Sequence, residues 1–382
     1  MTQPETDPAP PARVPGLAAL GRLVARSLGI DVSTLEASLQ PVTLDELPDV
    51  TEFRRTHLSL SDAWDDPGYL QWRYRLGRDQ GGFGELWRVR SQGRLLAILG
   101  LEQMEIMLQG EVTQGAQVMD LLVHPDAQES GLGVWINQAL LARQAFTLAV
   151  GANQNSAGIV RRLFLPLAPR LTLTHLLDLR PFVERRWPRL ARLPLATRLA
   201  NVGLACWRWT LLRQGDRNIA LHTVTRLDSL PAEGGHGPNT VQRRHSADYL
   251  QRRLFNNPRR ALSVRLASRG EAVIGLIAWA VEHDDLGRPE LHIVHWQHDQ
   301  PDTFIALLQD AVRQANALRC TCVRVLLQDQ ATQDAALRVG FLHARHDPGR
   351  PCGVQASDAD LAQRLARATW SLTDLTDDSD GY

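Results

Sequence analysis

The residues best placed to do chemistry lie where an apolar stretch meets a glycine-containing loop. Residues 119–135 read MDLLVHPDAQESGLGVW. A predicted strand ends at Pro125, and a loop of the form Q-x-x-G-x-G then opens a predicted helix. Backbone N–H groups at a helix start point outward, and the helix dipole adds positive potential there. Gly131 and Gly133 let the backbone approach a ligand closely, so the loop predicts an anion-binding site.

The elements around this loop form a series that is repeated further along the chain. Turns at Gln92-Gly93 and Gln109-Gly110 separate the first predicted strands. The first series comprises strands 85–91, 95–108 and 116–123, a helix from 131 to about 145, strand 147–152 and a helix from Ser156. The second series comprises strands 261–267, 272–282 and 290–296, helix 304–318 and strand 321–327.

Short sequence matches between the two series support a duplication. They occur in the same order: TLDELP at 43–48 with RLDSLP at 226–231, YLQWR at 69–73 with YLQRR at 249–253, and GRLLAILG at 93–100 with GEAVIG at 270–275. Three ordered matches predict two copies of one α+β unit.

In this setting the loop resembles the acetyl-CoA motif of the GNAT superfamily, V-x-P-x-x-(Q/R)-x-x-G-x-(G/A). The resemblance implies an α+β chain of two tandem GNAT-like domains, each a mixed, mostly antiparallel twisted sheet flanked by helices. The second copy is degenerate, because it has no glycine loop before Phe304. The expected divisions are a disordered tail 1–15, an amphipathic helix 16–40, domain one 41–180, a basic linker with helices 181–217, domain two 218–350, and a C-terminal helix with an acidic tail 351–382.

The resemblance also implies a site for acetyl-CoA or another acyl-CoA. Leu122 and Val123 would contact the pantetheine arm, and the loop would hold the pyrophosphate. The full set of implied coenzyme contacts is Leu122, Val123, Gln128, Glu129, Ser130, Gly131, Leu132, Gly133, Asn153 and Ser156. Glu129 departs from the basic residues common in such loops. The Tyr that commonly serves as general acid would fall at Val160, so that acid is missing, replaced or unnecessary.

Acyl transfer to an amine requires the amine to lose a proton, and two side chains are candidate bases. Asp120 and His124 lie on or beside the last strand of the motif, on the same face as Leu122 if no bulge intervenes. Asp120 could equally cap a neighbouring loop. The acceptor is expected in a groove between the copies, lined by Tyr69, Trp72, Arg73 and Tyr74, unless these side chains belong to the core.

Composition excludes several classes of site. The chain has no lysine, so neither a Walker A phosphate loop nor a pyridoxal Schiff base can form. Its 42 basic and 42 acidic residues balance, and no nucleic-acid partner is expected. Four cysteines are too few for a disulfide scaffold, and Cys320 and Cys322 are expected as buried thiols. His292, His295 and His298 alternate along a strand, so no metal site is predicted.

The remaining segments bear on location and partners. No secretory signal or transmembrane stretch is found, which predicts a cytoplasmic protein. Residues 180–213 carry eight arginines against one acid, Glu184, together with three tryptophans. This stretch could contact a membrane surface or an acidic partner, or it could be an interdomain helix whose arginines pair elsewhere. The acidic end, 374–380, is expected to be solvated.

Three functions remain open on the sequence alone. The first is an acyl-CoA-dependent N-acyltransferase, acting as an acetyltransferase on a primary amine of a small molecule or peptide. The second is a non-catalytic GNAT-like protein that binds a partner or an acyl-CoA. The third is a peptide-bond-forming aminoacyltransferase, since paired GNAT-like domains also occur in the family that adds amino acids to cell-wall precursors.

Overall fold

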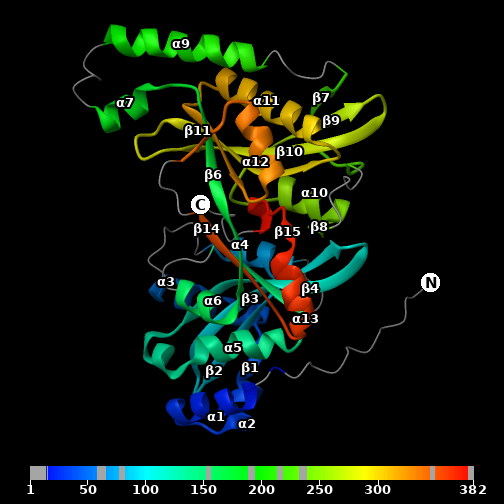
Figure 1. The fold of residues 1–382 in the computed structure, drawn as a ribbon. Coiled ribbons are helices and arrows are strands. Elements are labelled where there is room, and N and C mark those ends of the chain that lie inside the picture. The colour runs from blue at the N-terminus through cyan, green and yellow to red at the C-terminus, as the bar shows by residue number, and fades with distance from the viewer. Residues whose placement is uncertain are drawn as a thin grey trace.

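The structure is a computed structural model that describes residues 14, 16–57, 66–76, 82–151, 156–187, 194–212, 218–231, 239–344 and 349–376. It confirms the α+β class: helices flank a large, mostly antiparallel twisted sheet. Figure 1 shows an elongated molecule in which the N-terminal elements occupy one end and α9, β9 and α11 the other. The tail predicted at 1–15 falls almost wholly outside the described residues.

The first half contains these elements: α1 (Leu17–Leu28), α2 (Val32–Ser38), β1 (Leu39–Pro41), η1 (Leu44–Glu46), α3 (Leu47–His57), α4 (Pro67–Arg73), β2 (Gly84–Ser91), β3 (Arg94–Leu108), β4 (Glu111–Val123), η3 (Pro125–Ser130), α5 (Leu132–Leu141), β5 (Phe146–Val150) and α6 (Ala157–Leu163). β6 (Leu165–Leu176), α7 (Arg180–Arg186) and α9 (Pro194–Leu212) follow.

The second half contains β7 (Ala220–Val224), β8 (Thr240–Arg244), α10 (Ala247–Phe255), β9 (Ser263–Arg269), β10 (Ala272–His283), β11 (Pro289–His298), α11 (Pro301–Ala317), β12 (Cys322–Leu327), α12 (Gln330–Arg338) and β13 (Leu342–His343). The chain then forms β14 (Arg350–Ala356), α13 (Ala359–Arg367), β15 (Thr369–Trp370) and η4 (Asp374–Thr376).

Both halves share one order of elements: a helix, three antiparallel strands, a helix, a strand and a helix. It runs from α4 to α6 and again from α10 to α12. Both predicted turns are present, since Gln92-Gly93 and Gln109-Gly110 have the paired positive φ values that tight hairpins need. The helix expected to reach about residue 145 ends at Leu141.

Two strands join the halves into one sheet. β6 pairs with β14 through Leu165–Arg170 and with β12 through Leu171–Leu176, so a single strand belongs to both halves. β14 in turn lies between β5 and β6, which returns the end of the chain to the first half. Figure 1 shows β6 running between the two ends of the molecule. The segment 351–382, expected as a helix and tail, therefore begins within a central strand.

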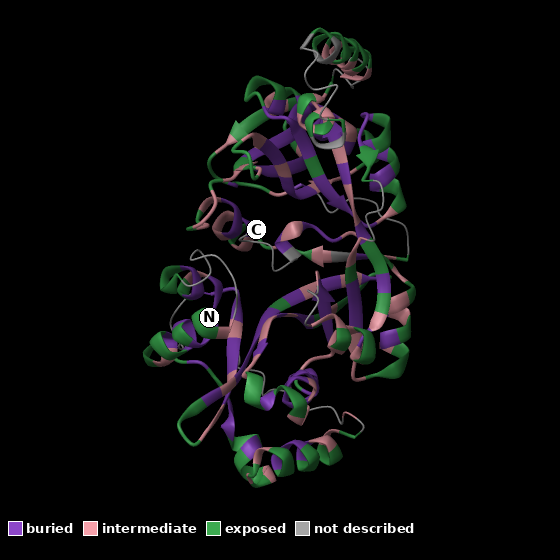
Figure 2. Ribbon diagram, turned by 90° about the vertical axis from the view of Figure 1, so that its left-hand side faces the viewer, coloured by how far each residue is buried: buried purple, intermediate pink, exposed green. Residues whose placement is uncertain are grey.

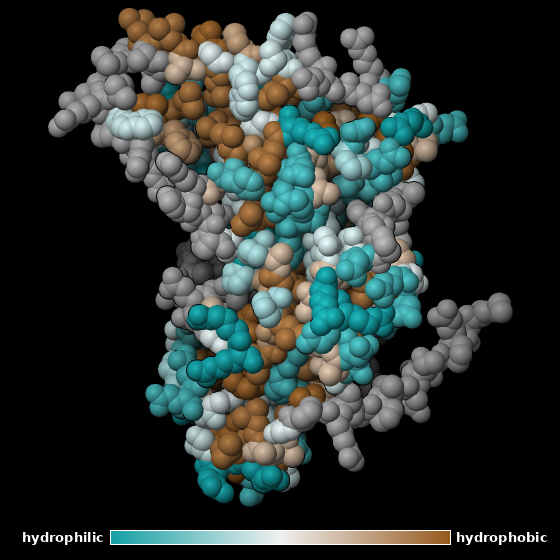
Figure 3. Space-filling model, viewed as in Figure 1, coloured by the Kyte–Doolittle hydropathy of each residue, from teal (hydrophilic) through white to brown (hydrophobic). Residues whose placement is uncertain are grey.

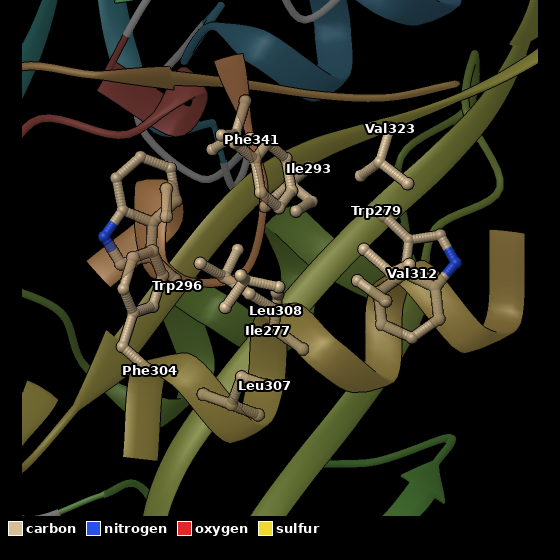
Figure 4. Close-up of a cluster of buried hydrophobic side chains, with 14 of the residues drawn as sticks. Ile277, Trp279, Ile293, Trp296, Phe304, Leu307, Leu308, Val312, Val323 and Phe341 are labelled. Carbon is tan, nitrogen blue, oxygen red and sulfur yellow. The ribbon is translucent and has the colours of Figure 1, made fainter. Parts of the chain in front are cut away.

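Apolar clusters fill both faces of the sheet, and Figure 2 shows buried residues along its central strands. In the second half Trp279, Trp296 and Phe304 pack with Leu307 and Leu308 of α11 (Figure 4). The acidic end is not wholly solvated, because Asp374 pairs with Arg170, whose side chain is fully buried.

Candidate functional site

The Q-x-x-G-x-G loop folds as a short 3₁₀ turn followed directly by α5. Pro125 begins η3, and Gly131 joins η3 to α5 with φ 81°. This left-handed conformation favours glycine at that position. A Cβ at Gly131 would meet only Val24 and Leu20 of α1, at 3.7 and 3.9 Å. The backbone turn, rather than crowding by neighbouring side chains, therefore favours glycine at position 131.

The backbone amides at the start of α5 divide into two groups. Leu132 N donates to Ser130 Oγ at 3.2 Å, while Val134 N and Trp135 N donate to the carbonyl of Gly131. For the amides of Gly131 and Gly133, no acceptor is found among the residues that the structure describes. These two N–H groups, at the positive end of a helix, can therefore donate hydrogen bonds to an anion.

Several loop side chains are engaged within the loop itself. Ser130 Oγ donates to Ala127 O at 2.7 Å, so Ser130 caps the helix start. Gln128 Nε2 donates to the carbonyl of Val123 at 3.2 Å, which fastens the loop to the end of β4. Glu129 is exposed.

Gly133 has a packing role that sequence reasoning did not anticipate. A Cβ there would lie 3.1 Å from Ile159 Cδ1 and 3.3 Å from Val123 Cγ2. The glycine thus lets the start of α5 lie close to α6 and to the end of β4. Two coenzyme contacts were predicted after β5. Asn153 lies outside the described residues, and Ser156 is the residue directly before α6.

β4 and β5 separate next to this helix start. The two strands run parallel and pair only from Ala116↔Thr147 to Val118↔Ala149. β4 continues to Val123 and remains paired with β3 there, whereas β5 ends at Val150. Residues 119–123 thus present a strand edge that no described strand covers, and this edge leads straight to the loop. An extended ligand can pair with such an edge.

A β-bulge interrupts β4 at Asp120. Leu99 of β3 faces two residues of β4, between the pairs Ile98↔Leu122 and Gly100↔Met119, and Asp120 has φ 51°. Met119 and Leu122 pack in the cluster beneath α3 and α4. The bulge turns the Asp120 carboxylate toward the same helices, where Arg54 Nη1 contacts Oδ1 at 2.9 Å and the Tyr74 hydroxyl donates to Oδ2.

These partners determine the protonation of Asp120. Burial alone would raise the pKa of its carboxyl, but the charge of Arg54 and the hydrogen bond from Tyr74 hold the pKa below its ordinary value. Arg54 is fully buried and its own pKa is raised, because the attraction of Asp120 outweighs the effect of burial. Asp120 is thus held as a carboxylate, which makes it a poor proton acceptor at neutral pH.

His124 lies at the end of β4 in a different environment. Its Nδ1 accepts from Asp126 N at 3.2 Å, and Arg94 approaches its Nε2 at 3.3 Å while also pairing with Asp126 at 2.9 Å. The ring of His57 from α3 stands edge-on at 4.7 Å. Burial, and then repulsion from His124, lowers the pKa of His57. Two imidazoles therefore meet at the carboxyl end of the uncovered edge.

The four residues predicted to line an acceptor groove are mostly interior. Tyr69, Arg73 and Tyr74 are 2 %, 1 % and 0 % exposed, and only Trp72 is half-buried. They join the halves: Arg253 of α10 lies 5.3 Å from the Trp72 ring, and Arg259 lies 3.7 Å from the Tyr69 ring. The repeated YLQ helices, α4 and α10, thus contact each other in the middle part of the molecule (Figure 1).

A buried carboxylate lies at the centre of this contact. Glu102 of β3 is 0 % exposed and pairs with Arg73 at 3.2 Å and with Arg243 of β8. The Tyr249 hydroxyl donates to it at 2.6 Å. Burial would raise the pKa of Glu102, but the two arginines lower it. Burial likewise raises the pKa of Tyr249 well above its usual value, which keeps its proton in place.

Further buried polar atoms between the halves were not predicted from the sequence. Gln117, the cross-strand neighbour of Glu102, is fully buried, and neither amide atom has a hydrogen-bond partner within the described part of the chain. The same holds for His245 Nδ1 and His295 Nε2, whose rings lie 5.3 Å apart. Burial, aided by Arg243, lowers the pKa of His295 to about 3. No motif signals this set, because its members come from both halves.

The equivalent position in the second half differs. α11 begins at Pro301, and the Thr303 hydroxyl donates to Asp299 at 2.6 Å, so a carboxylate already occupies this helix start. Among the residues described, no group of three His, Cys, Asp or Glu could hold a metal ion. Cys320 and Cys322 are buried free thiols, as predicted. None of the described helices is long and apolar enough to cross a membrane.

Comparison with known proteins identifies the fold. The sequence matches no family model and no curated protein. Among solved structures, a GCN5-related N-acetyltransferase from Anabaena variabilis aligns at TM-score 0.54 and 10% identity, covering 84% of this chain and 72% of that one. One from Kribbella flavida aligns at TM-score 0.54 and 12% identity, covering 86% and 74%. A probable N-acyltransferase from Enterococcus faecalis aligns at TM-score 0.51 and 9% identity, covering 84% and 72%. The chain therefore has the fold of the GCN5-related N-acetyltransferases.

Proposed function

We propose that the chain is an acyl-CoA-dependent N-acyltransferase, which transfers an acetyl group to a primary amine of a small molecule or peptide. One observation carries the proposal. The edge of β4 at 119–123, which no described strand covers, ends at a helix start where the amides of Gly131 and Gly133 find no acceptor among the described residues. An elongated ligand with an anionic end matches an extended edge that leads to such a helix start.

In this proposal the loop 128–133 holds the pyrophosphate, and the backbone of Leu122 and Val123 meets the pantetheine arm. Gln128 would release the carbonyl of Val123 if an arm pairs there, and its exposed side chain is free to move. Glu129 is exposed, so its carboxylate can remain in water beside a bound pyrophosphate.

His124 is the better candidate for the base of the two predicted residues. Transfer forms a C–N bond and breaks a C–S bond, while the amine loses a proton and the thiolate gains one. The lowered pKa of Asp120 argues against proton uptake there. The ion pair with Arg54 suits it to fixing the bulge. His124 is half-buried and bordered by His57, and an imidazole is the side chain that most often serves as a general base.

The acceptor is proposed to bind between the halves, near Gln117. Neither amide atom of Gln117 has a partner among the described residues, and the same holds for His245 Nδ1 and His295 Nε2, so these atoms can hydrogen-bond a polar molecule. Gln117 also lies on β4, three residues before Asp120, so an acceptor here is close to the uncovered edge.

One observation favours the second candidate, a non-catalytic protein that binds an acyl-CoA or a partner. Val160 of α6 stands where related enzymes commonly place an acidic Tyr, and its side chain cannot protonate a thiolate. A thiol leaves at moderate pKa, however, so an acid is helpful rather than essential.

Thermal unfolding in acetyl-CoA and in free coenzyme A tests the proposal. A ligand at a hundred times its Kd stabilises the folded state by about 2.7 kcal/mol, so the melting temperature must rise. The absence of any rise at millimolar ligand contradicts both readings that involve acyl-CoA. A rise without thiol release across a panel of amines supports the non-catalytic alternative.

A further inference from the structure

α9 is attached to the second half along one side only. Trp207 stacks near His175, with ring centroids 6.2 Å apart, and Leu211 packs against Gly340. Gln309 Nε2 donates to the carbonyl of Leu211 at 3.1 Å, and Asn201 bonds Asp178 and the amide of Leu179. Figure 1 places the helix at the outer end of the molecule, away from the first half.

The opposite side of α9 carries an apolar stripe that faces solvent. Leu195, Leu199 and Val202 are 72 %, 72 % and 60 % exposed, Trp209 is 57 % exposed, and Cys206 is also exposed. Their spacing of four, three, four and three residues places all five within about 80° of the helix circumference. The exposed Thr210 beside them donates its hydroxyl to Trp207 O, so it needs no outside acceptor. Figure 3 shows the apolar surface gathered over α9.

The segment of sequence that contains the stripe is strongly basic. Residues 180–213 contain eight arginines and a single acid, Glu184. Glu184 is already paired with Arg288 at 2.9 Å. Two more exposed aromatics, Phe182 and Trp187, are 57 % and 55 % exposed in and after α7. Monomeric proteins rarely expose an apolar face of this kind without a partner for it.

The chemistry of this surface selects one occupant. A second copy of the chain would bring the same basic segment to this surface, and like charges repel. A nucleic acid would satisfy the arginines but leave the Leu and Val side chains in water. An anionic lipid surface satisfies both, because acyl chains accept the stripe, headgroups attract arginine, and Trp favours the boundary between them.

We propose that the outward stripe of α9 docks the protein on an anionic lipid surface, with the helix lying in the plane of the interface. At about 28 Å long, α9 presents the stripe as one continuous line. This inference does not depend on the proposed acyl transfer, because α9 contributes nothing to the loop 128–133 or to β4.

Vesicle co-sedimentation tests it with the full chain. The probes are vesicles of phosphatidylcholine alone and vesicles of phosphatidylcholine mixed equally with phosphatidylglycerol. The variant L195S/L199S/W209S removes the stripe, and its exposed positions leave the folded core untouched. The matched control V112S/L286S/L318S removes three other side chains, which are 50 %, 70 % and 52 % exposed on other elements.

The wild type and the control should sediment with the anionic vesicles, less so as salt rises and weakly with the neutral vesicles. The stripe variant should partition at least about tenfold more weakly. The proposal is overturned if the wild type stays in the supernatant, or if the stripe variant binds as the wild type does. It is also overturned if the stripe instead supports concentration-dependent self-association or nucleic-acid binding without vesicle binding.

Discussion

Gly100 of β3 leaves the space that the hydroxyl of Tyr74 occupies above the sheet. A Cβ at Gly100 would overlap that hydroxyl and the Met119 side chain, both of which are buried. The Tyr74 hydroxyl in turn donates to Asp120 at the bulge of β4. A glycine on one strand thus permits the contact that orients a carboxylate on the next.

Gly100→Ala should therefore lower the free energy of unfolding by about 1–3 kcal/mol, as expected for overpacking a buried site. Urea denaturation measures the change. Gly158→Ala is the control, since a Cβ there meets nothing within 4 Å and alanine suits a helix. If Tyr74→Phe does not relieve part of the Gly100→Ala penalty in the double variant, the hydroxyl is not what the glycine accommodates.

Glu102 holds the two halves together through charge, and its neutralisation should be costly. Glu102→Gln leaves Arg243 buried without its carboxylate, which typically destabilises by about 3–5 kcal/mol. Glu105→Gln on the same strand breaks a more exposed pair with Arg244 and should cost at most about 1 kcal/mol. Equal losses from the two variants, measured by denaturant unfolding, would show that the Glu102 network contributes no more than a surface pair.

His175 should make the fold sensitive to mild acid. Burial, and then the charge of Arg208, lowers the pKa of His175 from 6.5 to about 4. Between these two values the unfolded chain binds a proton at His175 and the folded chain does not. The contribution of neutral His175 to the free energy of unfolding is therefore complete above pH 6.5 and declines as the pH falls toward 4. His175→Phe should flatten the fall in unfolding free energy across this window, whereas His283→Phe at an exposed position should not. An unchanged slope in His175→Phe would contradict the assignment.

Substitutions of His124 and Asp120 should have different effects on kcat, measured with any amine that the wild type acylates. His124→Gln should lower kcat by about 10²–10⁴-fold with KM little changed, since it removes the proposed base. Asp120→Asn should mainly lower stability, because Arg54 loses its charged partner. A kcat loss confined to Asp120→Asn, with His124→Gln fully active, would reverse the two roles.

Much of the fold could be predicted from the sequence, because the contacts that shape it are local. The turns at Gln92-Gly93 and Gln109-Gly110 and the alternation of apolar residues marked β2, β3 and β4 to within a few residues. β14 was not predicted as a strand. Its sequence, RPCGVQA, has little alternation, and its partners β5 and β6 lie about two hundred residues earlier in the chain.

Around the candidate site, the start of the helix was predicted, whereas the contacts of the side chains were not. The glycine loop identified the start of α5, but nothing near Asp120 signalled a bulge, since the bulge depends on register with β3. Arg73 was predicted to line an acceptor groove, and no pattern in the sequence indicated a role for Arg54 or Glu102. Glu102 is enclosed by Arg243 of β8 and Tyr249 of α10 from the other half, which sequence periodicity cannot place.

Coenzyme binding at the loop 128–133 is the central claim, and titration calorimetry with acetyl-CoA tests it most directly. Gly131→Glu replaces the left-handed glycine that shapes this turn and adds a negative charge at the helix start, which repels an anion there, and Gly110→Glu is its match at a hairpin turn. The two glycines have φ values of 81° and 82°, so both variants bear a similar backbone penalty of about 1–2 kcal/mol. The wild type and Gly110→Glu should bind acetyl-CoA, and Gly131→Glu should not. Equal binding by all three proteins, or no binding by the wild type, would contradict the claim.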